Sequence, residues 1–248
     1  MNEQEIAKKK MEEICKIFDI SIADVEQRLA DLDEDGLLVA RYDDDEAGYK
    51  FRSIRYYDIQ GLHLNRFYYA LASLVLKDVK NVLEIGTGDA LSTIVLSKLF
   101  PNASIFTIDL PQGDPRFNRW RQKSAPKTER GRQRQERLNR GNITFFEKNT
   151  FFLLDLGLPR EFEFILVDGD HTYPQIAGDI MFAYSRIVED GFLFIHDYYE
   201  TNRKNCRVGE VVDWMEQRIP EKVFIFPMAT PPGTPDQKMA VVVKGLLK

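Results

Sequence analysis

The stretch from Asn81 to Leu99, NVLEIGTGDALSTIVLSKL, decides the fold that we predict for this chain. Its first five residues, Asn81–Ile85, form a short apolar run that predicts a buried strand. The strand turns through the Gly86–Gly88 segment into an amphipathic helix over Ala90–Leu99. Such a turn presents backbone N–H groups and lets a ligand approach the backbone closely. The stretch therefore predicts a strand–turn–helix unit with a binding function at the turn.

From this unit onward, short apolar runs alternate with helical ones, which is typical of a parallel sheet covered by helices on both faces. The last two runs are joined only by ATPPGTPDQ, which is too short for a crossover helix, so this pair should be antiparallel. We predict an α/β fold, a doubly wound, seven-stranded, mostly parallel sheet with a C-terminal antiparallel hairpin. The strands are expected at Asn81–Ile85, Ser104–Leu110, Ile143–Glu147, Phe162–Asp168, Gly191–His196, Lys222–Pro227 and Met239–Val243, with helices at Ala90–Leu99, Pro174–Glu189 and Val208–Arg218.

The first 79 residues predict an N-terminal helical appendage, and residues 80–248 a Rossmann-like domain. Helical periodicity covers Ile6–Ile20, and Ser21 can cap a second helix. Residues 111–141 are rich in arginine and poor in apolar residues, so they break the α/β rhythm. They predict either a solvated charged helix or a mobile lid that covers the site and attracts an anionic group.

Composition excludes several classes of protein. The chain has 248 residues, 34 basic and 39 acidic, which argues against a nucleic-acid partner held by bulk charge. No apolar run is long enough to cross a bilayer, and the start MNEQEIAKKKMEEICKIF lacks the apolar region of a signal peptide, so we expect a cytoplasmic protein. Cys15 and Cys206 form no metal-binding or redox motif. The apolar N-terminal helices could pair between subunits as a homo-oligomer.

A carboxylate ends the second predicted strand. The run SIFTIDL places Asp109 about 20 residues beyond the glycines, where a carboxylate can accept hydrogen bonds from both ribose hydroxyls. Together, the turn and this acid predict a nucleoside site outside the carboxyl ends of the strands. Dinucleotide dehydrogenases use a similar turn with a third glycine, and Leu91 stands at that position here. A nucleotide-dependent oxidoreductase is therefore the less favoured alternative.

Two further strand ends carry acids and histidines. The fourth predicted strand ends on Asp168, with His171 in the following turn, and the fifth ends on His196 and Asp197. Neighbouring parallel strands lie about 4.8 Å apart, so the two aspartates converge if these strands pair. Close carboxylates repel unless a proton or a cation separates them, which predicts a divalent metal. The alternative is that Asp168 merely caps the helix near Pro174.

Glu84, the missing third glycine and the closing antiparallel pair resemble class I S-adenosylmethionine-dependent methyltransferases. The resemblance covers about residues 80–245. In that family the glycine turn lies near the methionine part of the cofactor, and the acid of the second strand holds the ribose. S-adenosylmethionine is therefore the implied cofactor. The residues implied to bind it are Glu84, Gly86, Thr87, Gly88, Asp109, Asn149 and Asp168, with Asp89 and Thr150 as further candidates.

The second cluster resembles a narrower group, the macrocin-type sugar O-methyltransferases and the related cephalosporin-hydroxylase-like proteins. In that group the acids bind a divalent metal, and a histidine three residues past the first aspartate acts as base. Asp168, Asp197 and His171 match these positions, whereas His196 stands where some members have glutamate. The resemblance implies magnesium or manganese held by Asp168, His196 and Asp197, with His171 and Asp168 as catalytic residues.

The reaction implied by both resemblances is metal-assisted O-methylation of a hydroxyl on a small molecule of sugar or natural-product type. Tyr173, Tyr198 and Tyr199 are candidates to line the acceptor site. Two alternatives stay open: a non-catalytic S-adenosylmethionine-binding module, in which the acids and histidines are only structural, and the oxidoreductase. Neither a nucleic acid nor a membrane is expected as a partner.

Overall fold

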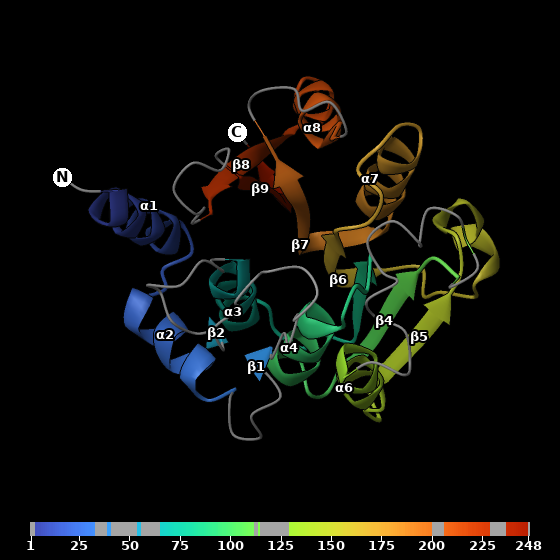
Figure 1. Cartoon of the computed structure of the whole chain (residues 1–248). Helices are drawn as coiled ribbons and strands as arrows, with labels where there is room; N and C mark the ends of the chain where they lie inside the picture. Colours follow the sequence, from blue (N-terminus) through green and yellow to red (C-terminus); the bar gives the residue numbers. More distant parts are fainter. Residues whose placement is uncertain are drawn as a thin grey trace.

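The computed structural model describes residues 3–32, 39–40, 54–55, 65–111, 114, 129–199, 206–228 and 237–247. Its centre is a seven-stranded sheet in the order β5-β4-β3-β6-β7-β9-β8. Helices α3, α4 and α6 lie on one side of the sheet, and α7 and α8 lie on the other (Figure 1). Among the described helices, none has the length and apolar character needed to span a membrane.

The strand pairing confirms the predicted fold class. The first five strands of the sheet pair in parallel, and β9 pairs antiparallel with both β7 and β8. The order of strands reverses on either side of β3, so a ligand is expected at the carboxyl edge of the sheet near this strand. The strands are β3 (Asn81–Ile85), β4 (Ser104–Asp109), β5 (Ile143–Glu147), β6 (Phe162–Val167), β7 (Ile187–Tyr198), β8 (Glu221–Pro227) and β9 (Lys238–Leu247), and a separate antiparallel pair is formed by β1 (Val39–Ala40) and β2 (Ile54–Arg55).

One boundary differs clearly from its prediction. The helix expected to reach Glu189 ends at Arg186, and β7 begins at Ile187 rather than at Gly191. The register of β7 against β6 shifts near its start, and Asp190 has a left-handed backbone with φ 61°. The irregular start of β7 disturbs the alternation of apolar and polar residues that marks a strand. The sequence pattern therefore predicted that the helix would extend to Glu189. The helices are α1 (Glu3–Ile17), α2 (Ile22–Ala30), α3 (Asn65–Val75), α4 (Leu91–Leu99), α6 (Glu129–Leu138), α7 (Gln175–Arg186) and α8 (Val208–Glu216), with a 3-10 helix η2 (Thr150–Asp155).

The N-terminal helices share one core with the sheet. Val25 and Leu29 of α2 are buried in the same apolar cluster as Val82 of β3. The ring of Phe18 lies 5.3 Å from that of Phe192 in β7. Ser21 caps α2 as predicted, since its Oγ accepts a hydrogen bond from the Asp24 backbone N–H at 3.1 Å. The described part of the N-terminal helices therefore packs in one apolar cluster with the sheet, and the division of the chain near residue 79 stays a prediction.

The arginine-rich segment also differs from its prediction. Residues 129–138 form α6, the crossover helix between β4 and β5, so the α/β rhythm continues there. Arg134 and Arg137 are only 8% and 2% exposed, which contradicts a solvated charged helix over this part. The pattern misled because α6 buries arginines where most crossover helices bury apolar side chains. The lid predicted within 111–141 falls largely on residues 112–113 and 115–128, which lie outside the described residues.

Candidate functional site

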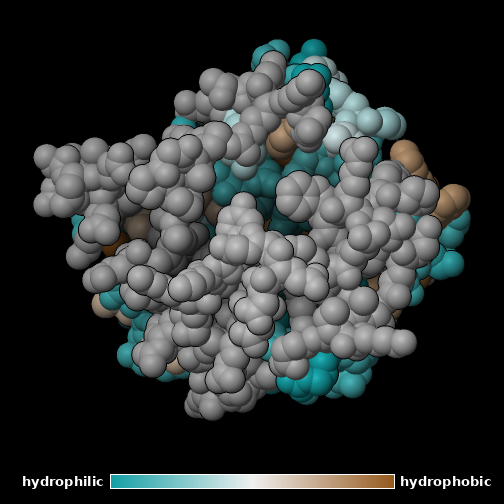
Figure 2. Space-filling model, viewed as in Figure 1, coloured by the Kyte–Doolittle hydropathy of each residue, from teal (hydrophilic) through white to brown (hydrophobic). Residues whose placement is uncertain are grey.

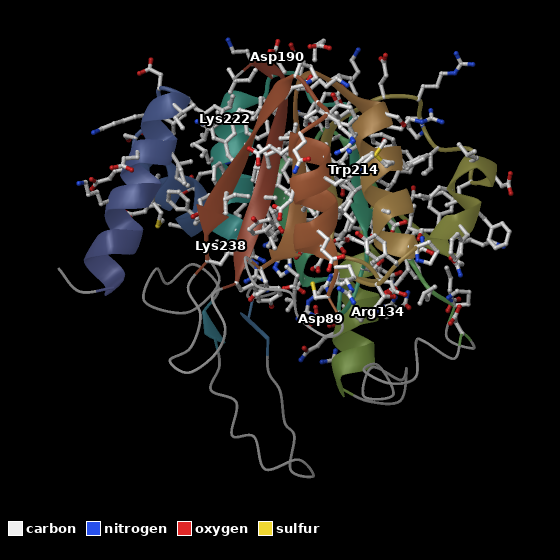
Figure 3. The ribbon with its side chains drawn as sticks, turned by 90° about the horizontal axis from the view of Figure 1, so that it is seen from above. Asp89, Arg134, Asp190, Trp214, Lys222 and Lys238 are labelled. Atoms are coloured by element: carbon white, nitrogen blue, oxygen red, sulfur yellow. The ribbon has the colours of Figure 1, made fainter. Side chains whose placement is uncertain are left out.

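Two groups of polar residues meet at the carboxyl edge of the sheet. The first is the glycine turn, residues 86–89 between β3 and α4. The second, which we call the histidine–aspartate cluster, comprises Asp168, His171, His196 and Asp197. Figure 3 shows Asp89 and Arg134 together at this edge, with Asp190 at the opposite end of the molecule. The described residues visible near the middle of Figure 2 are mostly hydrophilic.

Glycine is suited to positions 86 and 88 of the turn for two different physical reasons. Gly86 has φ +101°, and a Cβ there would lie 1.9 Å from the backbone oxygen of Asp168. Its N–H also donates to the Ile108 carbonyl at 2.8 Å, so the turn packs tightly between two strands. Gly88 has φ +57°, yet no described atom lies within 4 Å of the place where its Cβ would be. Gly86 therefore serves packing, whereas Gly88 leaves room for a ligand.

Asp109 lies beside the turn, as predicted. Its Oδ2 accepts a hydrogen bond from the Gly88 N–H at 3.2 Å, and its Oδ1 accepts one from the Leu110 N–H at 2.8 Å. The same Oδ2 lies 3.7 Å from Arg134 Nη2, so the carboxylate is held beside the turn by several contacts. The open space at Gly88 and this carboxylate together fit the ribose end of a nucleoside cofactor.

Glu84 supports the turn from beneath. Its side chain is 0% exposed, and its Oε2 accepts hydrogen bonds from Thr93 at 2.5 Å and Thr107 at 2.6 Å. The Oγ of Thr87 lies 2.7 Å from that of Thr107, which links the turn to this buried acid. Burial raises the pKa of Glu84 to about 8, although both threonine hydroxyls oppose the shift. A cofactor contact of Glu84 stays a prediction.

The segment after β5 holds the remaining cofactor candidates. The Asn149 side chain caps η2 by accepting a hydrogen bond from the Phe151 N–H at 3.0 Å. Thr150 accepts a hydrogen bond from Gln175, which also donates to Asp179 at 2.8 Å. Burial raises the pKa of Asp179 to about 6. Asn149 and Thr150 thus have structural roles here, and their contact with a cofactor stays a prediction.

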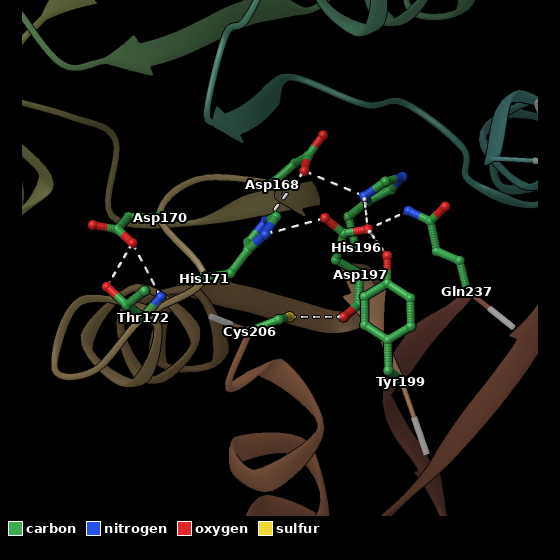
Figure 4. A network of polar contacts seen from close by, with 9 residues as sticks. All are labelled: Asp168, Asp170, His171, Thr172, His196, Asp197, Tyr199, Cys206 and Gln237. Carbon is green, nitrogen blue, oxygen red and sulfur yellow. Dashed lines mark hydrogen bonds and ion pairs between the residues drawn. The ribbon is translucent and has the colours of Figure 1, made fainter. Parts of the chain in front are cut away.

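The histidine–aspartate cluster forms as the strand ends predicted (Figure 4). Since β6 and β7 pair in parallel, Asp168 and Asp197 leave the sheet side by side. The Nδ1 of His171 lies 3.1 Å from Asp197 Oδ2, and its Nε2 lies 3.5 Å from Asp168 Oδ1. The Nδ1 of His196 lies 3.3 Å from Asp168 Oδ1 and 3.4 Å from Asp197 Oδ1. Both histidines therefore bridge the two carboxylates.

Protonated histidines offset the carboxylate charges in this cluster. Burial alone would raise the pKa of Asp168, but His196 and His171 outweigh it and hold that pKa well below its usual value. Burial alone would lower the pKa values of His171 and His196, but the two aspartates raise both. The pKa of Asp197 is likewise lowered by His196 despite burial. The opposite pKa shifts therefore reflect attraction between the two histidines and the two carboxylates.

The donor set also fits a divalent cation. Asp168, His171 and Asp197 each offer one ligand atom, and these atoms lie within 4.8 Å of one another. Among the described residues, His171 Nε2 and His196 Nδ1 are buried without a hydrogen bond of good geometry. This group contains His171, which the sequence analysis assigns as the base, and that assignment stays a prediction. His196 still contacts both carboxylates, so its ligand role stays a prediction.

Asp197 is held by Tyr199, which the sequence analysis expected to line the acceptor site, and by Gln237, which the sequence did not single out. Its backbone lies in the left-handed region with φ 60°. Its Oδ1 accepts hydrogen bonds from the Tyr199 hydroxyl at 3.2 Å and from Gln237, while its carbonyl accepts one from Cys206 Sγ at 3.3 Å. These contacts leave Oδ2 facing His171. Gln237 carries no local signal, since it is 40 residues away in the chain.

Comparisons with known proteins relate the chain to methyltransferases. Residues 83–198, which contain the glycine turn and the histidine–aspartate cluster, match a family model described as a methyltransferase domain. A putative O-methyltransferase from Klebsiella pneumoniae is similar at TM-score 0.55 and 16% identity, covering 89% of this chain and 90% of that one. The comparison with curated proteins gave no match.

Two structures solved with ligands have the same fold. The O-methyltransferase TomG from Streptomyces achromogenes, involved in tomaymycin synthesis and in complex with SAM, has TM-score 0.53 and 16% identity, covering 73% of this chain and 79% of its own. An O-methyltransferase from Bacillus cereus in complex with SAH has TM-score 0.53 and 14% identity, covering 90% and 91%.

Residues 83–198 match a methyltransferase domain, and the chain shares its fold with these solved O-methyltransferases. Both findings agree with the resemblance stated on Glu84, the missing third glycine and the closing antiparallel pair. The narrower macrocin-type subgroup stays a prediction.

Proposed function

We propose that this methyltransferase transfers a methyl group to a hydroxyl of a small molecule, of sugar or natural-product type, with the help of a divalent cation. The observation that carries the proposal is the histidine–aspartate cluster, in which two carboxylates and two histidines meet beside the glycine turn. The Asp168 backbone itself packs against Gly86, so the cofactor turn and the cluster are in direct contact.

Each group has a distinct part in the proposed reaction. When bound, S-adenosylmethionine supplies the methyl group on a positively charged sulfur, and magnesium or manganese supplies charge that favours ionisation of a nearby hydroxyl. Asp109 holds the ribose, and Gly88 gives the cofactor access to the turn. Asp168 and Asp197 hold the cation with one of the histidines. Fixing the acceptor oxygen in line with the methyl group supplies roughly 7–11 kcal/mol of the barrier reduction.

His171 is the proposed base. Its 3.1 Å contact with Asp197 Oδ2 favours the tautomer that carries its proton on Nδ1, which leaves Nε2 to accept the hydroxyl proton. Burial lowers the pKa of His171, but Asp168 and Asp197 raise it by more. Positive charge at the carboxylates would reverse that effect. Cation binding and base function therefore support each other.

The proposal is separated from its two alternatives by ligand binding. A non-catalytic module would bind S-adenosylhomocysteine but need no metal and transfer no methyl group. An oxidoreductase would be stabilised by NAD rather than by S-adenosylhomocysteine in a thermal shift assay. Titration with the two ligands therefore separates the oxidoreductase from the other two functions, and an assay of methyl transfer separates the methyltransferase from the non-catalytic module.

The cluster is tested by manganese binding. We expect calorimetry to show Mn²⁺ binding to the wild type in the presence of S-adenosylhomocysteine, and Asp168→Asn to weaken it at least about tenfold, since a ligand charge is lost. The matched control is Asp170→Asn, because Asp170 lies in the same turn, where its carboxylate accepts hydrogen bonds from Thr172. Equal Mn²⁺ affinity in both variants, or none in the wild type, would contradict the proposed metal assistance.

A further inference from the structure

Helix α6 presents two chemically similar but differently placed sets of arginines. Arg132 is exposed, with a side chain 56% accessible, and pairs with Glu136 one turn along the helix. Arg134 and Arg137 are buried at 8% and 2% exposure. Burying a guanidinium costs free energy unless its charge and donors are satisfied, so the two inward arginines need specific partners.

Those partners are the backbone and acid of the cofactor site. The Nε of Arg134 donates to the carbonyl oxygen of Gly88 at 2.9 Å, and its Nη2 lies 3.7 Å from Asp109 Oδ2. The Nη1 of Arg137 donates to the carbonyl oxygen of Asp89 at 2.9 Å. Two neighbouring carbonyls of the glycine turn are therefore fixed from α6.

The contacts of Arg134 close a small ring of interactions. Asp109 Oδ2 accepts the N–H of Gly88 at 3.2 Å, while Arg134 binds the carbonyl of the same residue and lies near the same carboxylate oxygen. The guanidinium is itself placed 4.8 Å above the ring of Phe145 in β5. Gly88 has φ +57° and much conformational freedom, so holding both of its polar groups fixes the orientation of the turn.

We propose that Arg134 is a positioning residue of the cofactor site, which holds the Gly88 peptide and the Asp109 carboxylate in the arrangement that receives the ribose. Arg137 supports the same turn at Asp89. The inference rests on the proposed use of Gly88 and Asp109 for the cofactor. The buried face of α6, a helix that the sequence presents as charged, therefore belongs to the proposed cofactor site.

The test compares three variants by calorimetry with S-adenosylhomocysteine. Arg134→Met should raise its Kd about 10-fold to 100-fold, because hydrogen bonds that involve a charged group are lost. Arg134→Lys should restore part of the affinity, since lysine can reach one partner but not both. Arg132→Met, on the exposed face of the same helix, should stay within about twofold. An Arg134→Met affinity equal to that of the wild type would overturn the inference.

A double-mutant cycle separates positioning from a general structural role. If Arg134 acts through Asp109, adding Arg134→Met to Asp109→Asn should cost much less than Arg134→Met alone. Losses that simply multiply would overturn this route. Should Arg134→Met fail to fold, Arg134→Lys carries the test, with a Kd at least about threefold above wild type expected and wild-type affinity contradicting it. Absence of binding by the wild type would instead overturn the proposed cofactor role as well.

Discussion

The glycine turn and the histidine–aspartate cluster lie at the same edge of the sheet but are built on opposite principles. The turn is held through its backbone: Gly86 packs on the Asp168 backbone, and the Gly88 peptide groups are bonded to Asp109 and Arg134. The cluster concentrates charge, and two of its buried histidine nitrogens lack a hydrogen bond among the described residues. Contacts within the chain thus fix the shape of the glycine turn, which we propose receives the cofactor. The histidine–aspartate cluster instead offers charged groups, which we propose bind a cation.

We expect the largest effect, a loss of stability, when alanine replaces Gly86 rather than Gly88 in the turn. Gly86→Ala places a Cβ against backbone, which cannot move cheaply, and it requires φ +101°, so we expect a loss of several kcal/mol of stability or failure to fold. Gly88→Ala meets no described atom and costs only the left-handed strain of about 1–2 kcal/mol.

Thermal unfolding and calorimetry together check this pair. Gly88→Ala should keep the fold but bind S-adenosylhomocysteine more weakly, because its methyl group enters the space left for the cofactor. Equal stability of the two variants would show that the packing account of Gly86 is wrong.

The next effect concerns the cluster alone. His171→Ala should lower methyl transfer by about 10²–10⁴-fold, the range of general-base assistance, while leaving S-adenosylhomocysteine affinity nearly unchanged. Stopped assays at saturating cofactor with a panel of hydroxylated acceptors measure the first quantity. Manganese affinity sharpens the assignment: a Kd within about threefold of wild type supports the base, whereas a loss of about tenfold or more makes His171 a ligand.

The smallest effect tests the buried acid beneath the turn. The pKa of Glu84 is about 8 when folded, above its ordinary value of 4.5, so the folded state binds its proton more tightly than the unfolded state does. Its contribution to stability therefore falls as pH rises from about 4.5 towards 8. Glu84→Gln carries no proton to lose, so its melting temperature relative to wild type should rise between pH 5 and pH 8. A difference that is independent of pH would contradict the raised pKa.

The fold and the centre of the cluster could be predicted because both depend on local patterns. Apolar runs mark the strands, the short ATPPGTPDQ link dictates the antiparallel pair, and acids at the ends of paired strands must converge, as Asp168 and Asp197 do. No knowledge of distant contacts was needed for these predictions. Asp109 followed for the same reason, because the end of β4 lies beside the turn after β3.

The supporting residues could not be predicted because they act across the fold. Arg134 comes from ERGRQRQERL, which has no apolar face and so gives no sign of burial. Gln237 reaches Asp197 only because β9 inserts beside β7. The separate roles of Gly86 and Gly88 likewise depend on the backbone of β6, which no spacing within the turn reveals.

The central claim is that one edge of the sheet holds the sulfonium cofactor and a divalent cation side by side. Anomalous diffraction from crystals grown with S-adenosylhomocysteine and Mn²⁺ tests it most directly. The account predicts ligand density at Gly88 and Asp109 and a manganese peak within coordination distance of both Asp168 and Asp197. Cofactor density without a manganese peak there would contradict the claim.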